Sequence, residues 1–152
     1  MSTRRTICQN RRARFEFDLD DTLEAGLILQ GSEVKSLRQG RASLEDAFVA
    51  FEGGKAVLLK CNIPIYAQAN RNNHEPTRPR PLLLNSVELA RLREATREKG
   101  LSIVPLEIYF KGPWIKVEIA VGRGRKLHDK RAAIRERDDR REAERAKALR
   151  VR

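Results

Sequence analysis

The sequence predicts a mainly β fold: an antiparallel, OB-like barrel with two or three short helices and a basic C-terminal tail that is disordered when free. Apolar residues alternate with polar ones in several short runs, which is the two-residue period of a half-buried strand. Turns that contain glycine join neighbouring runs as hairpins. The pattern holds no parallel βαβ repeat, and closing an antiparallel sheet into a barrel removes the edges that so small a body would expose.

Positive charge is concentrated at the two ends of the chain. The whole sequence carries 32 Lys and Arg against 21 Asp and Glu, a net charge of +11. Residues 123–152 hold 13 basic and 6 acidic residues, residues 1–14 hold five arginines and no acid, and residues 15–122 hold 14 basic and 15 acidic residues. We therefore divide the chain into a basic arm, a near-neutral body and a basic tail. This charge distribution predicts a polyanionic partner.

The first part of the body predicts two strands and a short helix. Apolar and polar residues alternate over residues 15–19 and 23–29, and Glu24 falls on the polar side. In residues 31–44, Ser32 is placed to cap a helix and Gly40 to end it. The same helix leaves exposed cations close together, a cluster that suits phosphates but is also ordinary on a helix surface: Lys35, Arg38 and Arg41.

The middle of the body predicts a hairpin followed by a long polar loop. Residues 47–51 and 56–61 are apolar, β-prone runs, and Gly53 and Gly54 between them supply the positive φ angles of a tight turn. Residues 68–80 are polar, and they predict an extended loop that is longer than a connector needs to be.

The next elements are a short strand and a capped helix. Residues 82–84 are apolar and β-prone, so we expect a strand there. Asn85 and Glu88 have the spacing of a capping box, and Gly100 is placed to end the helix that they begin.

A second hairpin is expected at the end of the body. Residues 101–110 and 114–121 are strand-like, and a Lys-Gly-Pro turn joins them. Pro105 cannot donate a ladder hydrogen bond, so its strand lies at an edge of the sheet or carries a bulge at that point.

Few residues are available for catalysis or for metal binding. His74 and His128 are the only imidazoles, and a disordered tail cannot hold His128 in place for acid–base chemistry. Cys8 and Cys61 lack zinc-ligand spacing with them, and we expect both to be reduced thiols. No phosphate-binding loop occurs. Because no apolar run approaches the ~20 residues of a membrane span, we expect a soluble protein with no membrane partner.

The tail has no continuous apolar stripe, although it is rich in helix-forming residues and contains no proline. An isolated helix without a packed face is marginal in water. We therefore expect a tail that is disordered alone and becomes helical where an anionic surface neutralises it. A solvated helix docked on the body is the alternative.

Four stretches, taken in order, resemble the SsrA-binding protein (SmpB) family of bacteria. They are EAGLILQGSEVKSLRQGRASLEDAF, HEPTRPRPLLLN, GLSIVPLEIYF and GRGRKLHDKR. The resemblance runs from about residue 10 into the tail, and it implies an OB-like barrel without enzymatic activity, metal or cofactor, located in the cytoplasm. The implied partners are the tRNA-like domain of transfer-messenger RNA (tmRNA), stalled ribosomes, and elongation factor Tu through the tmRNA complex.

The resemblance also assigns residues to two surfaces. The family surface for the tRNA-like domain is matched by Glu24, Leu83 and Asn85. Contacts with the RNA backbone are implied for Lys35, Arg38, Arg41, Asn10, Arg11, Arg12 and Arg14. The tail is expected to become helical in the empty message channel, which ribosomal RNA lines, and its decoding-centre motifs are matched by Gly124, Arg125, Lys126, His128, Asp129, Lys130 and Arg131.

Simpler roles remain open for two of these residues. Asn85 also fits a plain helix cap, and Leu83 also fits the core, because alternate residues of its strand face inward. Pro81 stands where the family usually has a lysine, which puts one local RNA contact in doubt. Two other functions also remain open: a general RNA-binding barrel, and a nuclease acting through His74 or His128.

Overall fold

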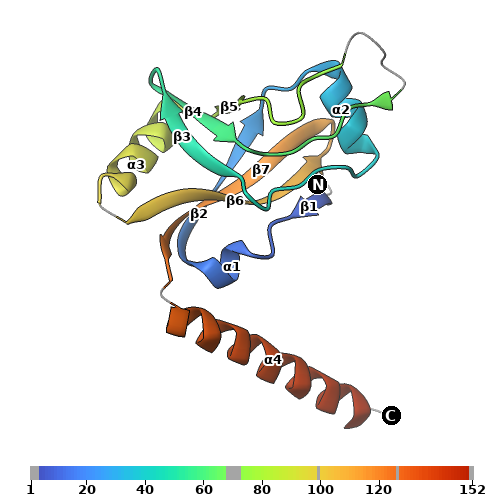
Figure 1. Ribbon diagram of the computed structural model, residues 1–152, viewed down its shortest axis with the longest axis vertical. Coiled ribbons are helices and arrows are strands. Elements are labelled where there is room, and N and C mark those ends of the chain that lie inside the picture. Colours follow the sequence, from blue (N-terminus) through green and yellow to red (C-terminus); the bar gives the residue numbers. More distant parts are fainter. Residues whose placement is uncertain (1–3, 68–72, 99, 126, 151–152) are drawn as a thin grey trace.

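An antiparallel barrel forms the body of the chain, and a long helix extends from it (Figure 1). The computed structural model describes residues 4–67, 73–98, 100–125 and 127–150. Within these residues the elements are β1 (Arg4–Gln9), α1 (Ala13–Glu16), β2 (Phe17–Leu27), α2 (Gly31–Arg38), β3 (Phe48–Glu52), β4 (Lys55–Leu59), β5 (Arg80–Leu83), α3 (Ser86–Thr96), β6 (Leu101–Lys111), β7 (Trp114–Gly124) and α4 (Leu127–Arg150).

The barrel closes through β6. The strand order is β1-β6-β3-β4-β5-β2-β7, and β6 also pairs with β7, so the two ends of the sheet meet. One edge of β6 pairs with β7 along the strand, whereas the other edge pairs with β1 and meets β3 at the single pair Val49↔Ile103. All pairings are antiparallel. The predicted mainly β barrel is therefore confirmed.

Several local predictions are confirmed by the backbone geometry. Gly53 and Gly54 both have positive φ angles in the β3–β4 turn. The Asn85–Glu88 capping box is formed at the start of α3, where the Glu88 N–H donates to Asn85 Oδ1 at 2.8 Å. The register of β6 against β7 shifts between Pro105 and Glu107, which is the bulge that the proline indicates.

Two predicted helix ends differ from the structure. Helix α2 begins earlier than expected, because Gln30 and Glu33 form its capping box and Ser32 lies inside the helix. Helix α3 ends at Thr96, and Gly100, with φ of 92°, makes the turn into β6. Both differences arise because more than one residue near each end can satisfy the free backbone groups.

Strands reach into both of the basic segments. Residues 4–9, within the expected arm, form strand β1, which is paired with β6. Strand β7 continues to Gly124, which lies opposite Phe17. Alternating apolar residues do not mark these strand ends, which are held by pairing with distant segments.

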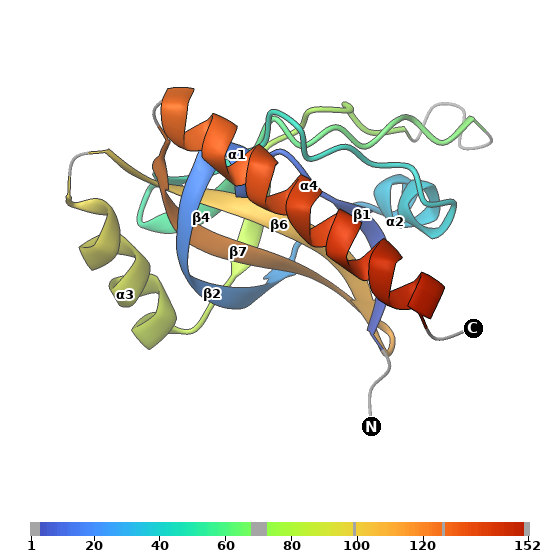
Figure 2. The same cartoon turned by 90° about the horizontal axis from the view of Figure 1, so that it is seen from below.

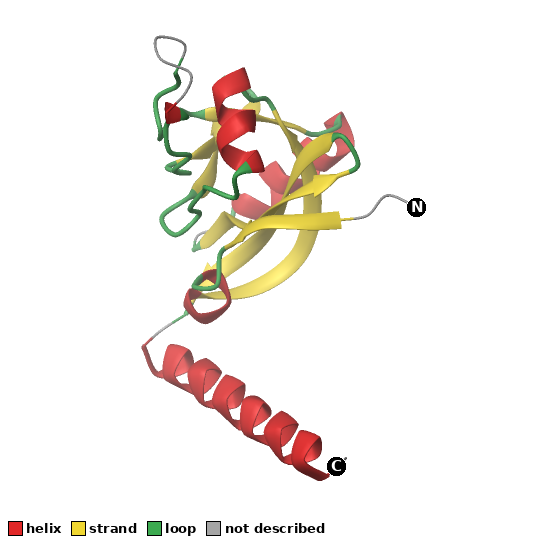
Figure 3. Cartoon of the chain, turned by 90° about the vertical axis from the view of Figure 1, so that its right-hand side faces the viewer, coloured by secondary structure: helices red, strands yellow, loops and turns green. Residues whose placement is uncertain are grey.

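Residues 127–150 of the tail form helix α4 (Figure 3), which matches the alternative of a solvated helix on the body. Its Ala, Arg, Glu and Lys residues favour helix intrinsically. The body supports it at α1, where the Arg137 guanidinium lies 4.3 Å from the centre of the Phe15 ring. Figure 2 shows α4 crossing the underside of the barrel, and residues of its segment 136–141 line a pocket with Glu107 and Glu118.

The main core fills the interior of the barrel, and a smaller cluster lies outside it under α1. The interior is formed by residues such as Leu58, Ile108 and Ile119, which are fully buried. The outer cluster contains Val104 and Ala120, packed against α1 and the start of β2. One end of the outer sheet face is therefore covered by apolar packing.

A buried ion network joins α2 to the start of β5 and to the loop before it. Arg80 is fully buried and donates to the Glu33 carboxylate and to the carbonyl of Cys61 at 2.7 Å. Arg78 donates to the other Glu33 oxygen at 2.6 Å. Burial on its own would raise the pKa of Glu33, but the hydrogen bonds from Arg78, the Gln30 N–H and Arg80 outweigh it and lower the pKa.

Replacing Glu33 by Gln keeps the side-chain shape but leaves Arg80 as a buried charge without its partner. Removing one member of a buried pair destabilises a protein by about 3–5 kcal/mol. We expect a loss of that size in the free energy of unfolding, measured by urea denaturation. The control is Glu45→Gln, because Glu45 pairs with Arg12 in solvent, where both side chains are 57% exposed. Equal losses in the two variants would mean that burial does not set the cost of breaking the Glu33–Arg80 pair.

The same pair of proteins gives a pH test. Because the folded pKa of Glu33 is lowered, its stabilisation is present above the ordinary glutamate pKa and is lost as the pH falls through the lowered value. The difference in stability between the wild type and Glu33→Gln should therefore shrink below about pH 4.

Candidate nucleic-acid interface

The pairing register of four strands aligns side chains in a row on the outer face of the barrel. Tyr109 of β6 lies opposite Lys116 of β7, Lys116 lies opposite Gly26 of β2, and Gly26 lies opposite Leu83 of β5. Neighbouring residues in such a row project from the same face of the sheet. Segments that are far apart in the sequence thus meet on one surface, which we call the outer face.

A second, acidic row runs beside the first. Glu107 of β6 lies opposite Glu118 of β7, and Glu118 lies opposite Glu24 of β2. Arg4 of β1 pairs with Glu107 at 2.8 Å and with Glu118 at 3.2 Å. Arg4 therefore offsets one of the two negative charges of Glu107 and Glu118, and Glu24 lies beyond them.

Tyr109 and Lys111 hold the Glu24 carboxylate in place. The Tyr109 hydroxyl donates a hydrogen bond to Glu24 Oε2, and Lys111 Nζ lies 3.1 Å from Glu24 Oε1. The hydrogen bond from Tyr109, followed by the contacts with Lys111, lowers the pKa of Glu24 despite an opposing effect of burial. Glu24 is 35% exposed. It is an ionised, oriented acceptor at the surface.

Arg4 supports this arrangement from the edge strand. Its guanidinium lies 3.7 Å from the centre of the Tyr109 ring. The ring is thereby covered from solvent, and Tyr109 is fully buried although it belongs to the outer face. Burial and the hydrogen bond to Glu24 raise the pKa of the Tyr109 hydroxyl, which stays a donor at neutral pH.

Leu83 and Asn85 continue the surface toward α3. Leu83 is 60% exposed and its neighbour Leu82 is 7% exposed, so Leu82 is the core residue of this strand. A Cβ atom on Gly26 would lie 3.1 Å from Leu83 Cβ, so a larger residue there would press on Leu83 and require a small shift of its side chain. Asn85 follows at the N-terminus of α3, where its side chain is committed to the helix cap.

The predicted cations on α2 form a separate exposed patch. Lys35, Arg38 and Arg41 are exposed, as the sequence predicts. Helices α2 and α3 lie at opposite ends of the barrel in Figures 1 and 2. The structure therefore does not bring these cations together with Asn85.

The residues before β2 that are expected to contact the RNA backbone have different environments. Asn10 is 9% exposed and its amide donates to the carbonyl of Pro105 at 3.0 Å. The prediction that Asn10 contacts the RNA backbone does not fit this buried position beside the bulge. Arg11, Arg12 and Arg14 are exposed around α1. Arg12 pairs with Glu45 at 2.7 Å.

The predicted decoding-centre residues extend across the junction of β7 and α4. Gly124 ends β7, and the Arg125 N–H donates to the carbonyl of Glu16 at 2.8 Å. Lys126 lies outside the described residues. The backbone of residues 128–131 is helical, but the side chains of His128, Asp129, Lys130 and Arg131 also lie outside the described part of the chain.

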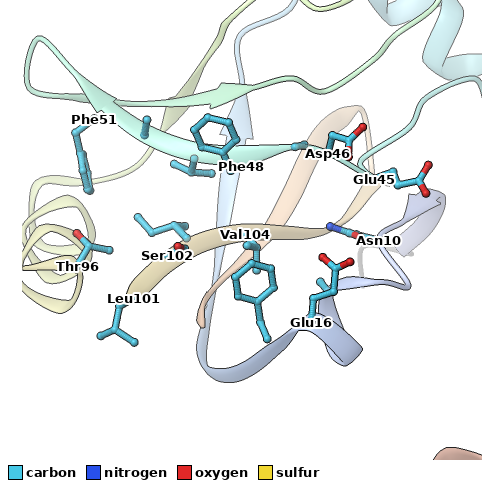
Figure 4. A pocket seen from close by; sticks show the side chains of 16 residues that line it. Asn10, Glu16, Glu45, Asp46, Phe48, Phe51, Thr96, Leu101, Ser102 and Val104 are labelled. Atoms are coloured by element: carbon cyan, nitrogen blue, oxygen red, sulfur yellow. The ribbon is translucent and has the colours of Figure 1, made fainter. Parts of the chain in front are cut away.

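A cavity of about 450 Å³ lies where β3 and β6 separate (Figure 4). Phe48 and Phe51 line its upper wall, whereas Glu16, Glu45 and Asp46 lie at one end. Carboxylates repel a phosphate backbone. The carboxylates of this cavity therefore do not favour a phosphate backbone there.

The candidates for catalysis and metal binding are dispersed or occupied. His74 is 5% exposed, and its ring nitrogens lie 2.8 Å from Ser32 Oγ and 2.7 Å from the Ile63 carbonyl. Cys8 and Cys61 are free thiols, and burial raises their pKa values to about 11 and about 12. Among the described residues, no three potential metal ligands cluster together.

None of the described helices is both long and apolar enough to cross a membrane.

The contribution of Tyr109, Lys111 and Lys116 is not predicted from the sequence. The alternation of residues 115–121 places Lys116 on the polar face of its strand. Nothing local indicates that Tyr109 lies beside Glu24, because that neighbourhood arises from pairing β6 with β7 and β7 with β2.

An antiparallel barrel with an open polar face and a cationic helix defines a nucleic-acid-binding barrel. The family model described as SmpB protein matches residues 7–149. The chain belongs to the SmpB family.

The relatives of the chain cover almost its whole length. The SsrA-binding protein of Streptomyces coelicolor is 52% identical over 142 residues, which are 93% of this chain and 89% of the relative. The SsrA-binding protein of Desulforudis audaxviator is 50% identical over 142 residues, 93% of each chain. A solved structure named "tmRNA-SmpB: a journey to the center of the bacterial ribosome" contains a 40% identical chain with a TM-score of 0.69, covering 84% of this chain and 94% of that one.

Replacing Tyr109 by Phe keeps the ring but removes the hydroxyl that donates to Glu24. We expect the pKa of Glu24 to rise toward its ordinary value, because the largest effect lowering it is lost. Carboxyl-carbon NMR titration measures this directly. Tyr66→Phe is the matched control, because the Tyr66 ring lies beside Lys35 of α2 and not beside Glu24. An unchanged Glu24 pKa in Tyr109→Phe would refute the proposed contact.

Proposed function

We propose that this chain is an RNA-binding adaptor without catalytic activity, which binds the tRNA-like domain of tmRNA and delivers it to stalled ribosomes for trans-translation. Its partners are tmRNA and the ribosome, and elongation factor Tu joins through the tmRNA complex. The delivery of tmRNA takes place in the cytoplasm, where ribosomes translate. Family membership and the SsrA-binding relatives support this function.

The observation that carries the assignment is the meeting of Glu24, Leu83 and Asn85 around one solvent-open surface. Leu83 lies opposite Gly26, which is two residues from Glu24 along β2, and Asn85 follows Leu83 by two residues at the N-terminus of α3. Glu24 offers carboxylate oxygens to base or 2′-hydroxyl donors, and Leu83 offers an apolar contact. A surface of this composition is suited to reading RNA shape and edges more than to neutralising phosphates.

The tail has the properties of a segment that enters an RNA-lined channel. Helix α4 has 24 residues, a length of about 36 Å at 1.5 Å per residue. It is charged on all sides, and its one large apolar residue in the described side chains, Ile134, is 41% exposed. A helix without an apolar face gains little from packing on a protein core. Phosphates of the message channel would instead neutralise its net positive charge.

The environment of His74 opposes the nuclease hypothesis. Its ring is buried, and both nitrogens have partners within 2.8 Å. A general base must reach its substrate. We therefore propose a structural role for His74: its ring links Ser32 of α2 to the Ile63 carbonyl in the loop after β4.

Binding to the tRNA-like domain of tmRNA and to an ordinary tRNA tests the function. We expect selective binding that survives truncation after Gly124, whereas tagging on stalled ribosomes is lost with α4. Glu24→Gln should weaken binding by about tenfold, because hydrogen bonds to charged groups contribute about 1.5–3 kcal/mol. Glu52→Gln, at the exposed β3–β4 turn, is the matched control. Equal affinity for both RNAs, lost with the tail, would instead indicate a general cationic binder.

Two substitutions separate the roles of Asn85. Asn85→Ala removes the cap, which should lower the free energy of unfolding by about 1 kcal/mol. Asn85→Ser keeps a capping oxygen but removes the amide. If the amide contacts RNA, both variants bind tmRNA more weakly and only Asn85→Ala loses stability. Normal RNA binding by Asn85→Ser would restrict Asn85 to its capping role. Thermal melts accompany each binding curve.

A further inference from the structure

Most aromatic rings in the described part of the chain are covered by a cation. The pairs are Arg4 with Tyr109, Arg5 with Phe110, Lys35 with Tyr66, Lys60 with Phe48, Arg93 with Phe51 and Arg137 with Phe15. Among the described rings, the two exceptions are Phe17, which packs on the apolar cluster under α1, and Trp114. Trp114 is 69% exposed. The next exposed ring, Phe48, is 37% exposed and has the Lys60 ammonium 5.9 Å from its centre, whereas Trp114 has no such cation partner among the described residues.

The hairpin between β6 and β7 presents Trp114 on a rigid support. Lys111 and Trp114 form the last pair of the ladder, and Gly112 between them has a φ of 59°. Glycine with positive φ at the first position of a two-residue turn matches the strand twist and keeps a hairpin tight. A ring held in this way loses little conformational freedom when a ligand stacks on it.

The charges around Trp114 suit an anionic ligand. Lys111 lies across the ladder from it, is 43% exposed and pairs with Glu24 at 3.1 Å. Lys116 lies two residues further along β7, on the same face, and forms no ion pair among the described residues. An aromatic ring between two ammonium groups complements a nucleotide, which has a flat base and a phosphate.

The strand pairing places Trp114 on the same face as the residues proposed to bind RNA. Lys116 is the neighbour of Gly26, which in turn lies opposite Leu83. Trp114 and Lys116 alternate with the inward-facing Ile115 and Val117, so they project from the outer face. The exposed ring thus lies at the hairpin end of the same face that carries Glu24.

We propose that Trp114 stacks on an unpaired base of the RNA bound to the outer face, with phosphates of that RNA beside Lys111 and Lys116. This inference rests on the proposed function. It extends the interface from the β2–β5 region to the tip of the β6–β7 hairpin. The ligand is RNA, and an apolar protein surface is the alternative that the experiment separates from it.

Intrinsic fluorescence tests the contact directly, because Trp114 is the only tryptophan in the chain. Full-length protein is titrated with RNA of the tmRNA tRNA-like domain, and binding is measured independently by filter retention. We expect tryptophan emission to be quenched with the same midpoint as the binding curve. Binding with unchanged emission would overturn stacking and leave the proposed function intact. Absence of binding would overturn both.

Substitutions measure how much the ring contributes. Trp114→Leu keeps an apolar side chain without a π face, and we expect about tenfold weaker RNA binding. Trp114→Phe keeps a ring, and we expect its affinity to lie within about threefold of wild type. Ile65→Ala is the control for an exposed apolar residue, since Ile65 is 52% exposed outside the outer face.

Two outcomes of the substitutions and titrations would overturn the proposal. The first is equal RNA affinity for Trp114→Leu and wild type. The second is an emission change that appears with ribosomes but not with the isolated RNA, which would assign Trp114 to a different partner. Melting temperatures should stay close to wild type in every variant, because an exposed side chain contributes little to folding.

Discussion

Pairing of β6 on both edges is the constraint on which the rest of this structure depends. One edge binds β7, and the other edge binds β1 and reaches β3, so the strand closes the barrel and also carries the N-terminal strand. The position of Tyr109 beside Glu24 follows from this register and from the pairing of β7 with β2. The relative positions of the interface side chains are therefore set by the strand register, and a change of register would move them apart.

Electrostatics divide the molecule into surfaces with different tasks. On the outer face Arg4 pairs with both Glu107 and Glu118, whereas Tyr109 and Lys111 hold Glu24 as an oriented acceptor. Most of the net charge lies instead in the tail, where a helix without an apolar face can follow an anionic wall. Recognition and electrostatic attraction are thus carried by separate parts of one chain.

Local features of this fold could be predicted from the sequence, whereas features that depend on long-range pairing could not. The Gly53-Gly54 turn and the capping box of Asn85 and Glu88 are short patterns whose meaning does not depend on the rest of the chain. Arg80, in contrast, lies in a polar stretch and is fully buried, because Glu33 from α2 reaches it. Strand β1 is not predicted either, because residues 4–9 show no clear alternation of apolar and polar residues and the strand is formed by pairing with β6. The resemblance to a family supplied Glu24 and Leu83, and only register shows which side chains orient them.

The bulge between Pro105 and Glu107 limits how the outer face can change. Before the bulge, Val104 faces the apolar cluster under α1; after it, Glu107 and Tyr109 take the same outer face, because one extra residue shifts the alternation. Deleting that residue would turn Tyr109 inward and bring Ile108 to the surface. Substitutions on either side are compatible with the barrel, but a change in strand length is not. Relatives of this chain are therefore expected to vary in composition along β6 and to keep its length constant.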